Sequence, residues 1–336
     1  MRWKSGLAVV AVVAALVGGA AMFRLAARQN YGLPQIEVLE PGETGVRVEE
    51  AGLFGNFYPA AGEGSHPGIL LLGGSEGGLG RAMKDIALEL QREGFSVFQL
   101  AYFGAPGTSE TLERIPLELF DRGLDWLGGR PGVDAQRLAL VGGSKGAEAV
   151  LLVATRHPEL RAVVAGMPAS VAWNGINWRR GGRSERSSWT SGGEDVPTMP
   201  FASWNQVEGV ISVYRSIEDS RLSRAAERAA IPVEKMRAEM LLVCGEAETM
   251  WPACPMSRAV AARAAERGGP QVRVLAYADA GHLVLGPPIL RDHAFYGRLD
   301  MLGGTVEGNA AARADSWPRI IAFLKDRTRP PLMPAE

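Results

Sequence analysis

The sequence is poor in the residues that build disulfide frameworks and metal centres, with two cysteines and four histidines among 336 residues. Cys244 lies in an apolar, strand-like run, and Cys254 follows a little further along the chain. Two cysteines at this spacing make neither a disulfide framework nor a metal cluster. We therefore expect Cys244 to pack as a small apolar residue and Cys254 to be a loop thiol, and we expect no metal or other cofactor.

The sequence also lacks an excess of charge of either sign. Lys and Arg number 36 and Asp and Glu number 37, which gives a formal net charge of -1. No basic stripe with interleaved aromatic residues is present, so we set nucleic-acid binding aside. The remaining composition, 46% hydrophobic and 22% charged, is that of an ordinary globular protein long enough to bury a large core.

One long stretch, Gly6 to Phe23, has no charged residue at all. As a helix it would extend roughly 27 Å, which is close to the thickness of a bilayer core. We expect residues 1–28 to be a membrane anchor, or alternatively a signal peptide cleaved near the small residues at 18–20. The basic residues around this stretch favour export of the globular part to a periplasmic or extracellular space. Residues 29–44, interrupted by Gly and Pro, read as a linker.

A candidate nucleophile lies between a predicted strand and a predicted helix. The apolar run Leu138–Val141 leads directly into Gly142-Gly143-Ser144-Lys145-Gly146, and a helical apolar pattern follows. Glycines two residues before and two residues after a serine let strand and helix pass closely while the hydroxyl stays exposed. The pattern predicts a nucleophile elbow at Ser144, with a plain glycine-rich turn as the alternative.

A second glycine-rich loop, Gly73–Gly78, follows the apolar run Ile69–Leu72. Backbone N–H groups of such a loop, facing the nucleophile, can hold the oxyanion of a tetrahedral intermediate. We expect the N–H of Lys145 and the N–H of Gly74 or Ser75 to form this oxyanion hole. A phosphate site is the weaker alternative, because the sequence has neither the lysine of a P-loop nor the acidic residue of a dinucleotide-binding motif. A plain turn is the third possibility.

The order of the predicted elements indicates an α/β fold. Helices and strands alternate over residues 45–330, after an antiparallel hairpin over residues 46–58, which is typical of a mostly parallel sheet with helices on both faces. Helices are expected over residues 115–127, 145–157 and 316–326, among others. The alternation breaks at about 168–230, which we interpret as a lid-like insertion. Its tryptophans either wall an acyl pocket or form a small core of their own, and its arginines either meet an anionic substrate or face solvent.

An acid and a histidine follow the elbow in the order that an α/β hydrolase requires. Glu248 comes after the apolar run 240–244, and His282 comes after the next predicted strand, 272–277. In this arrangement Ser144 would attack, His282 would take and return its proton, and Glu248 would fix the imidazole tautomer. Glu246 and Asp279 are alternative acids. The other histidines are less suitable, because His66 precedes the sheet, His157 ends a helix and His293 lies in a proline-rich excursion.

These motifs resemble the C-terminal catalytic domain of the acyl-CoA thioesterase and bile acid-CoA:amino acid N-acyltransferase family. The resemblance covers roughly residues 50–328 and implies an α/β-hydrolase fold, a Ser or Cys nucleophile, and cleavage or transfer of acyl groups from CoA thioesters. It rests on the following segments: Ile115-Pro116-Leu117-Glu118, Leu124-Asp125-Trp126-Leu127, Pro131-Gly132-Val133-Asp134, Gly143-Ser144-Lys145-Gly146-Ala147-Glu148, Ile231-Pro232-Val233-Glu234-Lys235, Trp251-Pro252 and Ala280-Gly281-His282-Leu283.

The chain departs from this family pattern at several points. There is no room for the family's N-terminal β-sandwich domain, and Glu248 stands where the family usually has aspartate. Ser144 replaces the cysteine of the amino-acid-conjugating members, which favours water over an amine as acceptor. We therefore predict a serine hydrolase that cleaves acyl thioesters or related carboxylic esters. An esterase, lipase or peptidase of the same fold is the first alternative, and a non-catalytic tethered binding protein is the second.

Overall fold

The computed structural model describes residues 36–330. Within this range no helix combines the length and the apolar character needed to cross a membrane. The predicted membrane segment, residues 1–28, lies outside the described residues, as does the first part of the predicted linker.

The core of the described chain is an eight-stranded sheet with the order β1-β2-β4-β3-β6-β7-β10-β11. The β1–β2 and β2–β4 pairs are antiparallel, and all later neighbours are parallel. The central strands are buried on both faces, which explains their unbroken apolar runs. The predicted mostly parallel sheet is thus confirmed. The strands are β1 (Val46–Glu50), β2 (Leu53–Tyr58), β3 (His66–Leu72), β4 (Ser96–Ala101), β6 (Val133–Gly143), β7 (Ala162–Gly166), β10 (Glu239–Gly245) and β11 (Val272–Tyr277).

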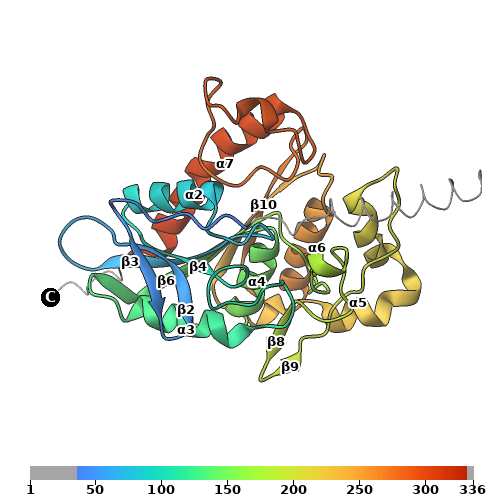
Figure 1. Ribbon diagram of the computed structural model, residues 1–336, viewed down its shortest axis with the longest axis horizontal. Helices are drawn as coiled ribbons and strands as arrows, with labels where there is room; N and C mark the ends of the chain where they lie inside the picture. Colours follow the sequence, from blue (N-terminus) through green and yellow to red (C-terminus); the bar gives the residue numbers. More distant parts are fainter. Residues whose placement is uncertain (1–35, 331–336) are drawn as a thin grey trace, which may run out of the picture.

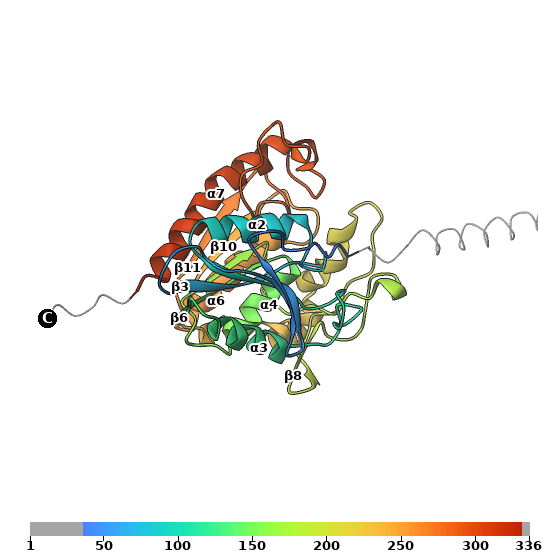
Figure 2. The same ribbon diagram turned by 60° about the vertical axis from the view of Figure 1, so that its left-hand side comes forward.

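Helices cover both faces of this sheet, as Figure 2 shows. Helices α2 (Arg81–Arg92) and α7 (Val306–Arg327) pack on one face, and α3 (Leu117–Gly128), α4 (Lys145–Ala154) and α6 (Ala253–Glu266) pack on the other. In α2 the buried side chains Met83, Ile86, Ala87 and Leu90 recur every three or four residues, so one apolar stripe faces the sheet. Each face therefore has its own apolar cluster.

Three helix boundaries differ from the prediction. Ile115–Pro116 forms a short strand, β5, rather than the first turn of α3, and Pro116 is the N-cap residue of that helix. The residue before a proline is pushed toward extended backbone, which agrees with the strand. Helix α4 ends at Ala154 instead of residue 157. Helix α7 begins at Val306, ten residues early, where Thr305 Oγ1 accepts the N–H of Gly308 at 2.9 Å and caps the helix.

The insertion at about 168–230 is largely irregular (Figure 1). It contains β8 (Trp189–Ser191) and β9 (Glu194–Asp195), which join β5 in a small sheet, the 3-10 helices η1 (Trp178–Arg180), η2 (Val210–Glu218) and η3 (Ser220–Leu222), and the short helix α5 (Ser223–Ala229). Trp173 stacks on Phe201 and meets Tyr214 edge-on, so these aromatic residues form a core within the insertion. The side chain of Trp204 is half exposed, and the arginines over residues 179–186 face solvent.

The two cysteines form a disulfide, Cys244–Cys254, with Cα atoms 5.2 Å apart. The expectation of a separate buried cysteine and a loop thiol was therefore wrong. Cys244 is the second-to-last residue of β10 and Cys254 lies in the first turn of α6. The chain between them folds back so that the two sulfur atoms bond. The ring closed by this disulfide contains Glu248.

Candidate active site

Ser144 lies at the sharp turn between β6 and α4, as the sequence predicts for a nucleophile elbow. Its backbone has φ 56° and ψ -121°, a left-handed conformation that a side-chain-bearing residue rarely adopts. The flanking glycines make this turn possible. A Cβ on Gly146 would lie 2.3 Å from the carbonyl oxygen of Leu72, and one on Gly142 would lie 2.4 Å from the carbonyl oxygen of Gly146. The strain thus presents the Ser144 hydroxyl above the sheet edge.

The structure brings Ser144, His282 and Glu248 together in one chain of hydrogen bonds. His282 Nε2 lies 3.0 Å from Ser144 Oγ, and His282 Nδ1 bonds to Glu248 Oε1. Both His282 and Glu248 are buried. Glu248 Oε1 also accepts the N–H of Trp251 at 3.3 Å, whereas Glu248 Oε2 is buried without a partner among residues 36–330. The imidazole is therefore fixed between a hydroxyl and a carboxylate.

Neither alternative acid contacts His282, and of the other histidines His293 lines the same pocket as Ser144 and His282. Glu246 forms a largely exposed ion pair with Arg258, and Asp279 is exposed at the surface. His157 bonds to Asp121 and Glu159 beyond the end of α4. Glu248 is thus the acidic side chain that reaches the His282 ring.

Backbone hydrogen bonds join the loops that carry the acid and the histidine. The N–H of Ala247 donates to the carbonyl of Ala280 at 3.0 Å, and the N–H of Gly304 donates to the carbonyl of Ala247 at 3.0 Å. The N–H of His282 itself donates to the carbonyl of Leu302 at 3.1 Å. The stretch before α7 therefore ties both loops together, which the sequence did not suggest.

The loop after β3 has a different hydrogen-bond pattern from the one expected for a simple oxyanion hole. The N–H of Gly74 donates to Glu76 Oε1 at 2.8 Å, so it is already occupied. The N–H groups of Ser75 and Lys145 have no acceptor among the described residues. The hydroxyl of Tyr102 donates to the carbonyl of Gly73 at 2.7 Å and so anchors the loop to the end of β4. Of the predicted donors, Ser75 and Lys145 are therefore the free pair.

A buried ion pair lies directly behind the elbow. Lys145 Nζ donates to both oxygens of Glu148, at 2.9 and 2.8 Å. Glu148 Oε1 also accepts the indole N–H of Trp189 at 2.6 Å and the backbone N–H of Trp173 at 3.0 Å, so the pair fastens the insertion to α4. Burial lowers the pKa of the Lys145 ammonium, and the carboxylate of Glu148 opposes that shift. The available sequence signal was the i, i+3 spacing of Lys and Glu on one helix.

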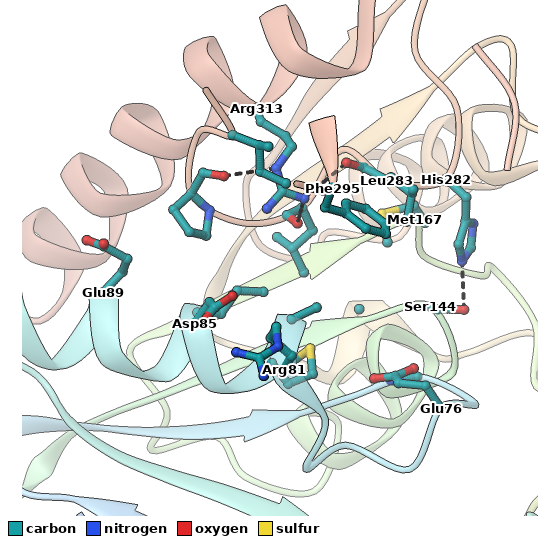
Figure 3. Close-up of a pocket in the computed structure, with 18 of the residues that line it drawn as sticks. Glu76, Arg81, Asp85, Glu89, Ser144, Met167, His282, Leu283, Phe295 and Arg313 are labelled. Atoms are coloured by element: carbon teal, nitrogen blue, oxygen red, sulfur yellow. Dashed lines mark hydrogen bonds between the residues drawn. The ribbon is translucent and has the colours of Figure 1, made fainter. Parts of the chain in front are cut away.

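A pocket of about 660 Å³ opens beside Ser144 and His282 (Figure 3). Its lining comes mainly from α2 and from the stretch 283–302, and none of its lining residues lies in the insertion 168–230. In Figure 3 the apolar side chain of Met167 and the carboxylate of Glu76 lie nearer to Ser144 than the charged side chains of α2 and α7 do. The lining includes the apolar residues Met83, Ile86, Met167, Leu285 and Phe295 and the charged residues Glu76, Arg81, Asp85, Glu89 and Arg313. Among residues 36–330 no cluster of His, Cys, Asp and Glu is suited to hold a metal ion.

The insertion's tryptophans consequently do not wall this pocket. The interpretation of those residues as the core of the insertion is the one that agrees with the structure. Much of the pocket wall comes instead from the proline-rich stretch after His282, for which the sequence indicated no role.

Comparison with known proteins shows the family to which this chain belongs. Residues 115–330 match the family described as BAAT / Acyl-CoA thioester hydrolase C terminal. The chain is 28% identical over 300 residues to the bile acid-CoA:amino acid N-acyltransferase of Mus musculus, a match that covers 87% of this chain and 67% of that protein. It is 27% identical over 293 residues to acyl-coenzyme A thioesterase 1 of Homo sapiens, with 85% and 66% covered. The match thus spans about two-thirds of the length of these relatives.

Solved structures show the same fold at lower identity. A Klebsiella pneumoniae protein described as a dienelactone hydrolase superposes with a TM-score of 0.53 at 18% identity, over 83% of this chain and 96% of that one. A puromycin-hydrolyzing peptidase of Mycobacterium tuberculosis gives a TM-score of 0.55 at 16% identity, over 84% of this chain and 39% of that one. The fold is that of an α/β hydrolase.

Proposed function

We propose that this chain, which belongs to the BAAT / acyl-CoA thioester hydrolase C-terminal family, is a serine hydrolase of acyl thioesters or related carboxylic esters. The observation that carries the proposal is the hydrogen-bonded series Ser144, His282 and Glu248 at the mouth of an apolar pocket. Family membership supports the thioester as the bond cleaved, and a serine rather than a cysteine supports water as the acceptor.

The positions of these groups support the following reaction. Ser144 Oγ attacks the carbonyl carbon while His282 Nε2 takes the hydroxyl proton, and Glu248 stabilises the imidazolium that forms. The N–H groups of Ser75 and Lys145 donate to the developing oxyanion. Collapse of the tetrahedral intermediate expels the thiol or alcohol, which receives its proton from His282. Water then repeats these steps on the acyl-enzyme and releases the acid.

The proposal is tested by labelling the protein with a fluorophosphonate and by assaying an acyl-CoA, an aryl ester and a peptide amide side by side. We expect labelling at Ser144 that disappears in Ser144→Ala, and faster cleavage of the thioester and ester than of the amide. Faster cleavage of the amide would indicate a peptidase of the same fold. A folded protein that takes no label would instead be the tethered binding protein.

We further propose that residues 1–28 attach the chain to a membrane and that the globular part is exported. The uncharged stretch at residues 6–23 supports attachment. The disulfide Cys244–Cys254 supports export, because disulfides persist in oxidising compartments. Since coenzyme A thioesters are cytoplasmic, an exported enzyme would act on another thioester or ester.

Membrane attachment and export are tested on the full-length chain in intact cells. We expect the protein in the membrane fraction, and we expect it to be digested by protease added outside the cytoplasmic membrane. Protection from that protease would place the domain on the cytoplasmic side and restore coenzyme A thioesters as substrates.

A further inference from the structure

Arg313 of helix α7 is a buried cation at the pocket that the proposed reaction does not use. Its relative exposure is 8%, and its guanidinium lines the pocket. Nε donates to the carbonyl of Pro287 at 2.9 Å, and Nη1 donates to the carbonyls of Leu283 and Leu285 at 3.2 and 2.7 Å. These bonds fix the direction of the side chain.

One edge of the guanidinium remains available to a ligand. Arg313 Nη2 has no hydrogen-bond partner in the part of the chain that the structure describes. It lies where a side chain at position 286 would be, since a Cβ on Gly286 would come within 2.5 Å of it. Glycine at this position therefore leaves the two Nη2 hydrogens open. An arginine has five N–H donors in a rigid fork that suits the two oxygens of a carboxylate or phosphate.

The charge of Arg313 is not balanced by a contacting acid. No ion pair joins it to a carboxylate among residues 36–330, and Asp85 of α2 acts on it only through its longer-range field. Burial lowers the pKa of Arg313 to about 10, so the guanidinium is still charged at neutral pH. A buried charge without a counter-charge is unfavourable, and a bound anion would relieve this.

The pocket that Ser144 and Arg313 share is lined mainly by apolar side chains. In the view of Figure 3 the side chains of Phe295 and Met167 lie between the guanidinium and the Ser144–His282 pair. A substrate that reaches both points would thus present a carbonyl at Ser144, an apolar middle section and an anionic end at Arg313.

We propose that Arg313 is a binding subsite for an anionic oxygen group of the substrate, separated from the scissile carbonyl by an apolar spacer. This inference rests on the proposed function, because it places the carbonyl at Ser144. The anionic group has two sources of the same chemistry. It is a carboxylate at the far end of a dicarboxylic acyl chain, or a phosphate in the leaving group.

The experiment compares four thioesters on the full chain: hexanoyl and adipoyl groups, each carried by coenzyme A and by the neutral thiol N-acetylcysteamine. Two ratios of kcat/KM report the two sources. The adipoyl to hexanoyl ratio on the neutral thiol reports a carboxylate on the acyl chain, and the coenzyme A to neutral thiol ratio with hexanoyl reports a phosphate. Thioesters of diacids with four to ten carbons then show which chain length between the carbonyl and the carboxylate gives the highest kcat/KM.

Two variants change the affinity of the Arg313 subsite for an anion in opposite directions. Arg313→Gln removes the charge, and we expect one ratio to fall about tenfold or more, the loss of a charge-assisted hydrogen bond. Asp85→Asn removes the negative charge that partly offsets the charge of Arg313, and it leaves the hydrogen bonds of Arg313 in place. We expect the same ratio to rise severalfold. Asp85→Asn keeps the test valid if Arg313→Gln does not fold. Ratios that stay constant in both variants would overturn the subsite.

Failure of the subsite is distinguishable from failure of the proposed hydrolysis. If the wild-type protein cleaves none of the four thioesters, the thioester proposal fails. The subsite is then measured from the rates at which Ser144 reacts with two fluorophosphonates of equal length, one ending in a methyl group and one in a carboxylate. Arg313→Lys should retain part of the preference for the anionic probe, because the charge remains but the fork geometry is lost.

Discussion

Glu148 and Glu248 are both buried beside the elbow, yet their surroundings differ. Both oxygens of Glu148 accept from Lys145, and one of them also accepts from Trp173 and Trp189. Glu248 bonds to His282 and to one backbone N–H through a single oxygen, and its second oxygen has no partner among the described residues. Both oxygens of Glu148 thus accept hydrogen bonds from fixed donors, whereas only one oxygen of Glu248 accepts any.

We propose that this difference distinguishes a structural acid, Glu148, from an acid that takes part in the reaction, Glu248. Lys145 takes no part in the proposed proton transfers, so the reaction leaves the surroundings of Glu148 unchanged. In the proposed reaction the ring beside Glu248 gains and loses a proton in each half-reaction, and the incompletely bonded carboxylate can respond to that change. Both positions are buried glutamates, so the two differ mainly in their partners, Lys145 for Glu148 and His282 for Glu248.

The largest expected effect is on Glu248. Glu248→Gln should lower kcat about 10⁴-fold, because the amide no longer holds the imidazole in the tautomer that accepts the Ser144 proton. The melting temperature should change little in comparison. Steady-state kinetics together with thermal unfolding measure both quantities. A variant that keeps near-normal turnover would show that Glu248 is not the acid of this site.

Glu148→Gln should act on stability instead. It leaves the Lys145 ammonium buried without its counter-charge, which typically destabilises a fold by about 3–5 kcal/mol. Urea unfolding measures the loss. The control is the double variant Lys145→Met with Glu148→Leu, which removes both charges and should recover most of the stability. If Glu148→Gln folds as stably as the wild type but has lost its activity, the contrast between the two glutamates is wrong.

The disulfide around Glu248 gives a smaller effect. Replacing Cys244 and Cys254 by alanine opens the ring that contains Glu248, and we expect about 2–3 kcal/mol of lost stability. The rate should fall modestly, since the loop carrying the acid is less restrained. Treating the wild type with dithiothreitol should reproduce both changes. An unchanged unfolding midpoint after verified reduction would contradict this role.

Trp189→Phe should have the smallest effect in this series. It removes one of the donors to Glu148 while keeping an aromatic ring in the insertion's packing, so a loss of about 1–2 kcal/mol is expected. Turnover per folded molecule should be unchanged, because Trp189 does not touch the Ser144–His282 pair. A marked change in kcat would indicate that the insertion communicates with the reaction through Glu148.

Much of the fold, and the proximity of Ser144, Glu248 and His282, could be predicted from the sequence. Strands such as β3 and β7 are unbroken apolar runs, and the elbow around Ser144 has a local glycine pattern. Glu248 and His282 each follow a predicted strand in the expected order. These are features in which a few neighbouring residues determine the structure.

The remaining parts depend on contacts between distant segments. The pairing of Cys244 with Cys254 depends on how the loop between them folds back, and the loss of Gly74 as an oxyanion donor depends on the rotamer of Glu76. Arg313 reaches the pocket only because α7 packs beneath the stretch 283–287. No local pattern marks such a residue as part of a site.

The hydrogen bond from the N–H of His282 to the carbonyl of Leu302, at 3.1 Å, closes the pocket-lining stretch 283–301 at its base. The chain leaves the sheet edge and returns to it at nearly the same point. In evolutionary terms we expect this stretch to be exchangeable, because its two ends are joined beside the histidine. A lineage that needed a new substrate could replace this stretch and retain the elbow, the acid loop and the reaction.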